Sequence, residues 1–249
     1  MNFPERFSQW ASGFSGCDGG DLGSPASPSI WVCGIEWGGD FSYKWLEEEL
    51  DTYYNQSSPG KGYDSPQDNL AYPYNINTMK LLCAINGMEC SEYKNFALEQ
   101  KPFVSGSSGY FKMNLYPIRF KGASPDKWSI WINSLTGFSN KKEYQDWCRK
   151  NRFVLFRELV KKHEPKLILC FGKTYLTDFK AAFCHGDEKW HHETIENRSL
   201  SFARNKNTLI AVCPFPTSRY GLNSNSLLRS FGRRISEEMR STHGLTCAY

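Results

Sequence analysis

Apolar residues gather in four short runs bounded by turn residues, and each run predicts a buried β-strand. The runs cover residues 29–36, 109–117, 166–172 and 208–213. Apolar residues at helical spacing predict helices over residues 43–54, 77–85, 141–163, 174–183 and 226–240. Strands that alternate with helices are typical of parallel βαβ units. We therefore expect an α/β fold, a three-layer α/β/α sandwich around a four-stranded parallel central sheet.

The remaining segments are rich in turn residues and predict irregular structure. Residues 1–28 form the expected lead-in, and residues 55–74 and 122–140 form two expected long loops. Long loops in a compact domain often carry function. The length of 249 residues fits one domain over residues 1–249.

Composition narrows the class of protein. The net charge of +4 permits a phosphate-binding face without requiring one. There is no apolar stretch near the ~20 residues of a membrane span, and no secretory signal at the N-terminus. The nine cysteines include no C-x-x-C pair, which favours reduced, buried thiols. We expect a cytoplasmic monomer without membrane contact.

The pair His191–His192 is the strongest hint of a metal ion. It stands in the polar segment CHGDEKWHHETIEN, whose spacing matches no standard metal motif. We expect a solvated loop there and no metal site.

Glycine and polar residues cluster after three of the four predicted strands. The segments are GIEWGGD at 34–40, NLYP at 114–117 and PFPTSRYGLNS at 214–224, with the shorter FGK at 171–173 after the third strand. Ligands of parallel α/β sheets bind beyond the carboxyl ends of the strands. The sequence therefore predicts that these segments form one site.

In this order and spacing, GIEWGGD, MNLYPI, ILCFGK and PFPTSRYGLNS resemble the motifs of the uracil-DNA glycosylase superfamily over about residues 29–235. GIEWGG is most similar to the GINPG form of the mismatch-specific branch. The resemblance implies a monofunctional DNA glycosylase without a cofactor. Such an enzyme flips a modified or damaged pyrimidine out of DNA, hydrolyses its N-glycosidic bond and leaves an abasic site.

The resemblance places Glu36 where the family has its catalytic Asp or Asn. A carboxylate there would stabilise the cationic sugar of the transition state and orient the attacking water. In the alternative interpretation, Glu36 caps a helix or pairs with a lysine. Asp40 is the rival catalytic carboxylate.

Five further positions fall in the base pocket that the resemblance implies. Asn114 would bind the edge of the flipped base, or else tie off a strand end. Gly38 replaces a tyrosine that blocks C5 in the uracil-specific enzymes, which favours a 5-substituted base; a tight turn is the other reason for a glycine. Tyr72 or Tyr74 would stack on the base. Phe215 replaces a family histidine that the mismatch-specific branch also lacks.

DNA contacts are expected from two segments, at Asn77, Lys80, Thr217, Ser218, Arg219 and Leu222. Asn77 and Lys80 would meet phosphate at a helix N-terminus, and Thr217 and Ser218 would bind phosphate as well. Leu222 stands where the family inserts a wedge into the DNA. Its alternative role is packing at the start of the last helix.

Three hypotheses follow for function. The first is a glycosylase for a modified pyrimidine, with the hydroxymethylated or glucosylated cytosine of phage DNA as one substrate and phage defence as the role. The second is an inactive module of the same fold that binds nucleic acid or a protein partner. The third, an unrelated α/β hydrolase or nucleotide-binding enzyme, lacks a G-x-S-x-G elbow, a P-loop or a dinucleotide fingerprint.

Overall fold

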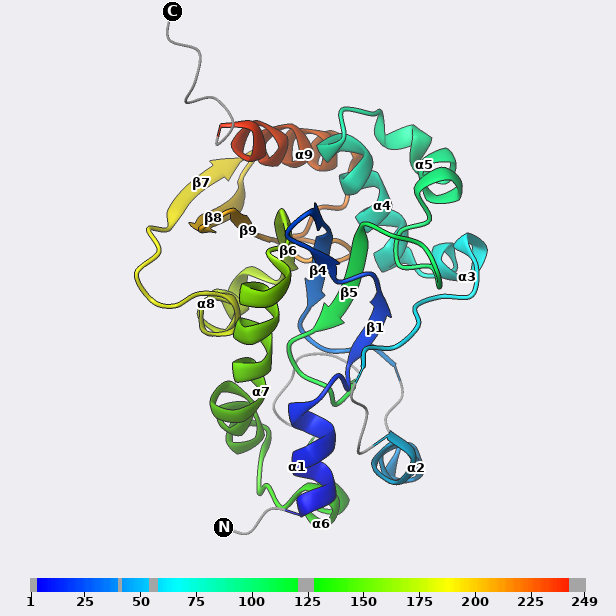
Figure 1. Ribbon diagram of the computed structural model, residues 1–249, viewed down its shortest axis with the longest axis vertical. Helices are drawn as coiled ribbons and strands as arrows, with labels where there is room; N and C mark the ends of the chain where they lie inside the picture. Colours follow the sequence, from blue (N-terminus) through cyan, green and yellow to red (C-terminus); the bar gives the residue numbers. More distant parts are fainter. Residues whose placement is uncertain (1–3, 40–41, 54–57, 121–127, 242–249) are drawn as a thin grey trace, which may run out of the picture.

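The computed structural model describes residues 4–39, 42–53, 58–120 and 128–241. Seven of the described strands form one mixed sheet in the order β1-β5-β4-β6-β9-β8-β7 (Figure 1). Their bounds, in chain order, are β1 Cys17–Gly20, β4 Ile30–Gly34, β5 Tyr110–Asn114, β6 Leu167–Phe171, β7 His191–Ile195, β8 Arg198–Asn205 and β9 Thr208–Cys213. A small hairpin of β2 Gly23–Ser24 and β3 Ser27–Pro28 stands apart from the sheet.

The four predicted strands lie together in the middle of this sheet. β5, β4, β6 and β9 are neighbours and run parallel, with Ile30 opposite both Tyr110 and Leu167. β1 adds to the β5 edge and β8 with β7 to the β9 edge, all antiparallel. The expected α/β class is confirmed, but the expected four-stranded parallel sheet is wrong, because antiparallel strands extend it on both sides.

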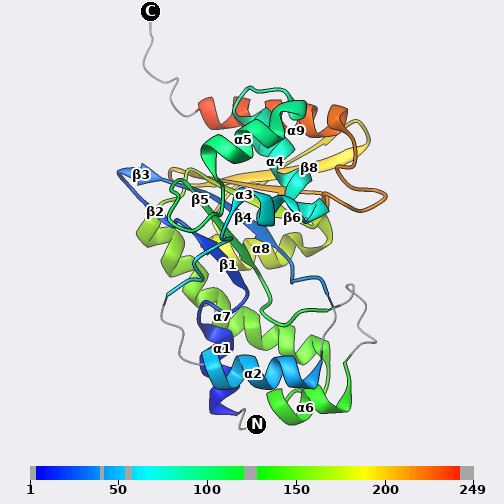
Figure 2. The ribbon, with the colours of Figure 1, turned by 90° about the vertical axis from the view of Figure 1, so that its right-hand side faces the viewer.

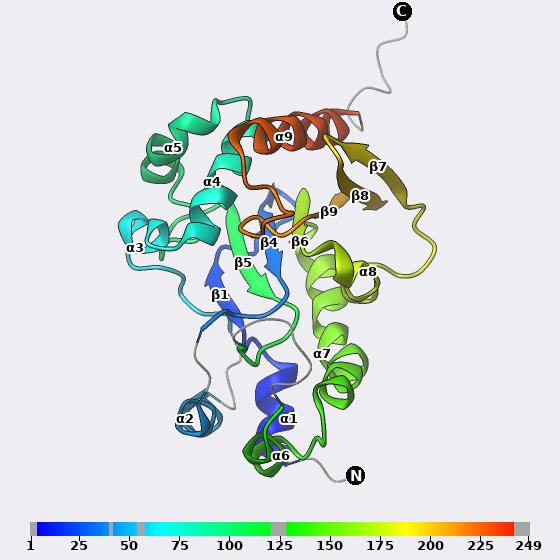
Figure 3. The same ribbon diagram turned by 180° about the vertical axis from the view of Figure 1, so that it is seen from behind.

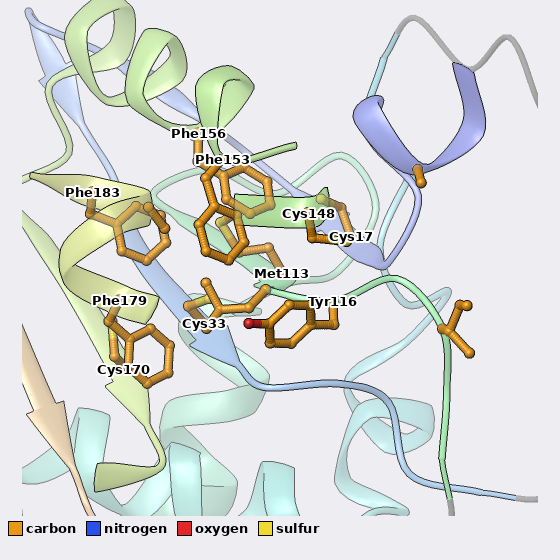
Figure 4. Close-up of a cluster of buried hydrophobic side chains, with 14 of the residues drawn as sticks. Cys17, Cys33, Met113, Tyr116, Cys148, Phe153, Phe156, Cys170, Phe179 and Phe183 are labelled. Carbon is orange, nitrogen blue, oxygen red and sulfur yellow. The ribbon is translucent and has the colours of Figure 1, made fainter. Parts of the chain in front are cut away.

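Helices cover both faces of the sheet (Figure 2). One face carries α3 Pro66–Leu70, α4 Pro73–Ile85, α5 Tyr93–Gln100 and α9 Asn225–Arg240. The other side carries α1 Glu5–Ser12, α2 Tyr43–Tyr53, α6 Ile130–Thr136, α7 Lys141–His163 and α8 Leu176–Phe183. Successive strand residues point to opposite faces, so each strand contributes to two separate cores. Val32 and Leu169 pack toward α4 and α9, whereas Cys33 and Cys170 pack under the phenylalanines of α7 and α8 (Figure 4).

The segments expected to be irregular contain elements that pattern analysis missed. β1 lies in the expected lead-in, and α6 lies in the expected loop at 122–140. The solvated loop expected around His191 and His192 is wrong, because both residues belong to β7, and His192 Nδ1 lies 2.8 Å from Ser201 Oγ on β8. β7 lies at the edge of the sheet and is largely exposed, and such strands have weak apolar patterns, which explains why it was missed.

Within the described ranges, eight cysteines are free and buried. The same part of the chain holds no group of three His, Cys, Asp or Glu side chains arranged for a metal ion. None of its helices has both the length and the apolar character needed to cross a membrane.

One buried cation ties the N-terminal segment to the sheet. The Arg152 side chain, on α7, is fully buried, and its Nη1 donates to the carbonyls of Ala11 at 2.7 Å and Gly13 at 3.0 Å. Its Nε donates to the Leu115 carbonyl at 2.8 Å, just beyond β5. Arg152 therefore fixes the chain before β1 against the carboxyl end of β5.

Candidate active site

The chain continues beyond β4 and β5 as two adjacent segments. The amides of Leu115 and Tyr116 donate to the carbonyls of Gly34 and Ile35, at 3.0 and 2.9 Å. This pairing carries the backbone past the sheet edge and presents the residues that follow Gly34 to the space above the strand ends.

Two adjoining cavities occupy this edge, with volumes of about 740 and 490 Å³. Both are lined by Glu36, Trp37, Gly38 and Phe215. The larger cavity extends over β5 and the start of α4, and the smaller one over the segments that follow β6 and β9. The segment leading from β9 to α9, orange in Figure 3, supplies the wall that both cavities share at Phe215.

Glu36 is almost enclosed and forms an ion pair with Lys141 at the start of α7. Both carboxylate oxygens lie 3.0 Å from Lys141 Nζ, and the two side chains are 8% and 4% exposed. Burial raises the pKa of Glu36, and the Lys141 ammonium opposes part of that rise. The pairing that we considered as an alternative is therefore present, and Glu36 still lines both cavities.

Asn114 and Gly34 face each other at the ends of β5 and β4. Asn114 Nδ2 donates to the Gly16 carbonyl at 3.1 Å, so the amide does tie the strand end to the N-terminal segment. A Cβ on Gly34 would lie 2.3 Å from Asn114 Oδ1, so only glycine admits the amide in this position. Asn114 also lines the larger cavity.

Aromatic rings line the same cavity. The ring of Tyr74 lies 5.5 Å from Phe215 and 5.6 Å from Phe171. Burial raises the pKa of Tyr74 well above its ordinary value, and its hydroxyl has no hydrogen-bond partner within the described ranges. Tyr72 is 56% exposed and lines the cavity at the N-cap of α4.

Gly38 faces open space. A Cβ added there would meet no atom within 4 Å, although Gly38 lines both cavities. A side chain at this position would extend into open space. The rival carboxylate Asp40 lies outside the described residues.

A buried polar cluster that sequence analysis missed forms one wall of the larger cavity. Lys112 Nζ donates to Asp18 Oδ1 at 3.2 Å and to the Tyr63 hydroxyl at 2.7 Å. Trp37 Nε1 donates to Asp18 Oδ2 at 3.2 Å, and Asn75 Nδ2 donates to the Tyr63 hydroxyl at 3.0 Å. Burial works against the charge of Lys112, but Asp18 and Tyr63 outweigh it and raise the pKa of the ammonium. The signal was a lysine inside the apolar run GYFKMN; nothing in the sequence marked Asp18.

Three of the residues expected to contact DNA have contacts within the protein. Leu222 is fully buried in the core under α4 and α9, so it cannot act as a wedge. Lys80 lies two turns into α4, because that helix begins at Pro73, and its ammonium lies 5.4 Å from the ring of Tyr93. Asn77 Nδ2 donates to the Pro216 carbonyl at 2.8 Å, which joins α4 to the loop before α9.

The exposed residues of that loop remain available to a large ligand. Thr217, Ser218 and Arg219 are exposed, and Tyr220 is 70% exposed with the Arg219 guanidinium 5.6 Å from its ring. Tyr220 also lines the smaller cavity.

No protein-family model and no curated protein matches this chain.

Proposed function

We propose that the protein is a monofunctional DNA glycosylase of uracil-DNA glycosylase-like fold that excises a modified pyrimidine and leaves an abasic site. One observation carries the proposal. Glu36, Asn114 and Phe215, which the resemblance assigns to catalysis and base binding, come from three separate strand ends and line one cavity.

Glu36 has the environment that a carboxylate needs for this chemistry. Its side chain is 8% exposed, and both carboxylate oxygens lie 3.0 Å from Lys141 Nζ. A carboxylate held in a site of low dielectric stabilises a nearby cationic sugar more strongly than it would in water. As a general base, this carboxylate would also orient the attacking water.

The cavity also suits a flipped base. The rings of Phe215 and Tyr74 offer aromatic surface for stacking, which contributes about 1–3 kcal/mol per base. Asn114 supplies an amide at the end of β5, and its Oδ1 is the atom not committed to Gly16. The open space at Gly38 favours a pyrimidine that carries a substituent at C5.

The DNA would lie across the loop that leads to α9. Thr217, Ser218 and Arg219 supply hydroxyl and guanidinium donors for phosphate. The exposed ring of Tyr220, and not Leu222, fills the space left by the extruded nucleotide in this proposal.

An abasic-site assay tests the proposal. Purified protein is incubated with single- and double-stranded DNA that carries uracil, cytosine, 5-methylcytosine or 5-hydroxymethylcytosine at one position, and alkali converts abasic sites to breaks. We expect breaks with the wild type and a loss of about 100-fold or more in Glu36→Gln, the range for a general base. Glu158→Gln, an exposed change on α7, is the matched control. No breaks from folded protein on any DNA, including DNA with glucosylated bases, would rule out the glycosylase.

One observation favours the alternative, an inactive module that binds nucleic acid. The Lys141 ammonium neutralises Glu36 within a nearly closed pair, which weakens the field that the carboxylate can exert on a cation. In that case DNA binding, measured by fluorescence anisotropy, persists in Glu36→Gln and no abasic sites form.

A further inference from the structure

The larger cavity extends beyond Asn114 to Lys112 and Asp18. Its volume of about 740 Å³ falls in the ~300–1,000 Å³ range of pockets that enclose whole drug-sized ligands. Lys112 precedes Asn114 by two residues on β5, so both side chains point to the same face of the sheet. A ligand that reaches from Asn114 along β5 would therefore meet Lys112.

Charged and polar groups line the cavity around Lys112, and the proposed bond cleavage does not use them. Lys112 and Asp18 are 9% and 15% exposed, and they form a buried ion pair beside the Tyr63 hydroxyl. Buried ion pairs are often no more stabilising than apolar residues of similar size. Because stability alone does not account for this ion pair, its place on a cavity wall indicates a role in binding a ligand.

Within the cluster, the Lys112 ammonium has hydrogen-bonding capacity to spare. The Lys112 ammonium has three N–H donors, and Asp18 and Tyr63 accept from it. Tyr74 Oη and Asn75 Oδ1, in residues that line the same cavity, have no partner in the part of the chain that the structure describes. A ligand with several hydroxyl groups matches such a set, because each hydroxyl both donates and accepts.

At Lys112 the charges favour a neutral ligand, and the Arg119 guanidinium lines another part of the same cavity. The Asp18 carboxylate lies against the Lys112 ammonium and compensates it, so an anionic group would meet a negative charge at the same place. The rings of Tyr63 and Tyr72, 6.2 Å apart, offer apolar surface for the C–H groups of a sugar ring.

We propose that Asp18, Lys112 and Tyr63 form a subsite for a hexose carried at C5 of the excised base. This inference rests on the proposed glycosylase function and names its substrate class: a glycosylated 5-hydroxymethylpyrimidine. The sugar hydroxyls bind Lys112 and Asp18, while the base remains at Asn114.

Matched DNA substrates test the subsite. They carry cytosine, 5-hydroxymethylcytosine, glucosylated 5-hydroxymethylcytosine or 5-carboxylcytosine at the same position, and kcat and KM for base release are measured on each. The wild type is expected to prefer the glucosylated base by at least about tenfold in kcat/KM, the effect of one or two hydrogen bonds to charged groups. Lys112→Met and the near-isosteric Asp18→Asn should abolish that preference and retain release of 5-hydroxymethylcytosine.

Two further variants distinguish a loss of the subsite from unfolding and from the loss of a charge. Tyr63→Phe keeps the ring and removes only the hydroxyl, so it reports on the subsite even where Lys112→Met unfolds. Lys162→Met, exposed on α7, controls for the loss of a charge. Equal release of bases with and without glucose, a preference for the 5-carboxyl base, or an equal loss on all substrates in Tyr63→Phe overturns the subsite and leaves the glycosylase standing. No base release from any substrate overturns both.

Discussion

Lys141 Nζ lies 3.0 Å from both carboxylate oxygens of Glu36, and the two side chains are nearly excluded from solvent. Lys141 is the first residue of α7, where its ammonium also lies 4.0 Å from the ring centroid of Phe120. The start of one helix thus favours the ionised form of the proposed catalytic group, against the larger effect of burial on its pKa.

The pH dependence of catalysis should follow from this pair. Burial raises the pKa of Glu36, and the active form is the carboxylate, so activity should fall as the pH drops through a pKa above the ordinary value. Lys141→Met removes the group that lowers this pKa. The acid limb of the kcat/KM profile should then move to higher pH. Lys142→Met, at an exposed neighbour paired with Asp146, is the control and should leave the profile in place. An unchanged limb in Lys141→Met would show that Glu36 does not control it.

Substitution of Gly38 should change specificity and leave the fold intact. A Cβ there meets nothing within 4 Å, and Gly38 is not among the glycines with a left-handed backbone. We expect Gly38→Tyr to keep its free energy of unfolding within about 0.5 kcal/mol of the wild type. Release of 5-substituted bases should fall at least about tenfold relative to unsubstituted pyrimidines, because the new ring occupies the space of the substituent. Parallel loss on every substrate would place Gly38 away from C5.

Substitutions of Leu222 and Tyr220 should affect different properties. The first should lower the stability of the fold, and the second should weaken DNA binding. Leu222→Ala removes a fully buried side chain and should lower the free energy of unfolding by about 2–5 kcal/mol. Tyr220→Ala changes a side chain that is 70% exposed, so the urea midpoint should stay near that of the wild type while Kd for DNA rises several-fold. The reverse result, weak DNA binding in a stable Leu222→Ala, would restore Leu222 as the wedge.

Arg152 should be among the most sensitive positions for stability. Arg152→Met leaves the carbonyls of Ala11, Gly13 and Leu115 without their donor. Each buried carbonyl left unpaired costs about 1–3 kcal/mol, so we expect a loss of at least about 3 kcal/mol in urea unfolding. Arg157→Met, which removes one hydrogen bond to the Ala181 carbonyl, is the matched control and should cost about 1 kcal/mol. Similar losses in the two variants would contradict the special role of Arg152.

The sequence predicted the centre of the molecule better than its edges. The apolar runs at β4, β5, β6 and β9 are buried on both faces, and such strands have a continuous hydrophobic signal. β1, with the sequence CDGG, has almost no such signal, since its conformation depends on pairing with β5. Local pattern cannot reveal a strand that only its partner stabilises.

The candidate site could be predicted from the sequence only where its residues follow a predicted strand. Glu36, Gly38 and Asn114 follow predicted strands, so the rule for parallel sheets located them. Asp18 and Tyr63 reach the cavity through contacts with Lys112 that span 94 and 49 residues, which no local pattern contains. Leu222 was misplaced because a leucine near a helix start fits a buried position and an exposed wedge equally well in sequence.

The Arg152 cluster also constrains the order in which the molecule assembles. Asp18 and the Gly16 carbonyl lie close to Ala11 in the sequence, yet the guanidinium that binds the Ala11 carbonyl follows it by 141 residues. Loop closure over such a separation comes late in folding. During translation the segment before Asp18 thus remains without its Arg152 contacts until Arg152 has left the ribosome. A partly synthesised chain therefore has no complete site.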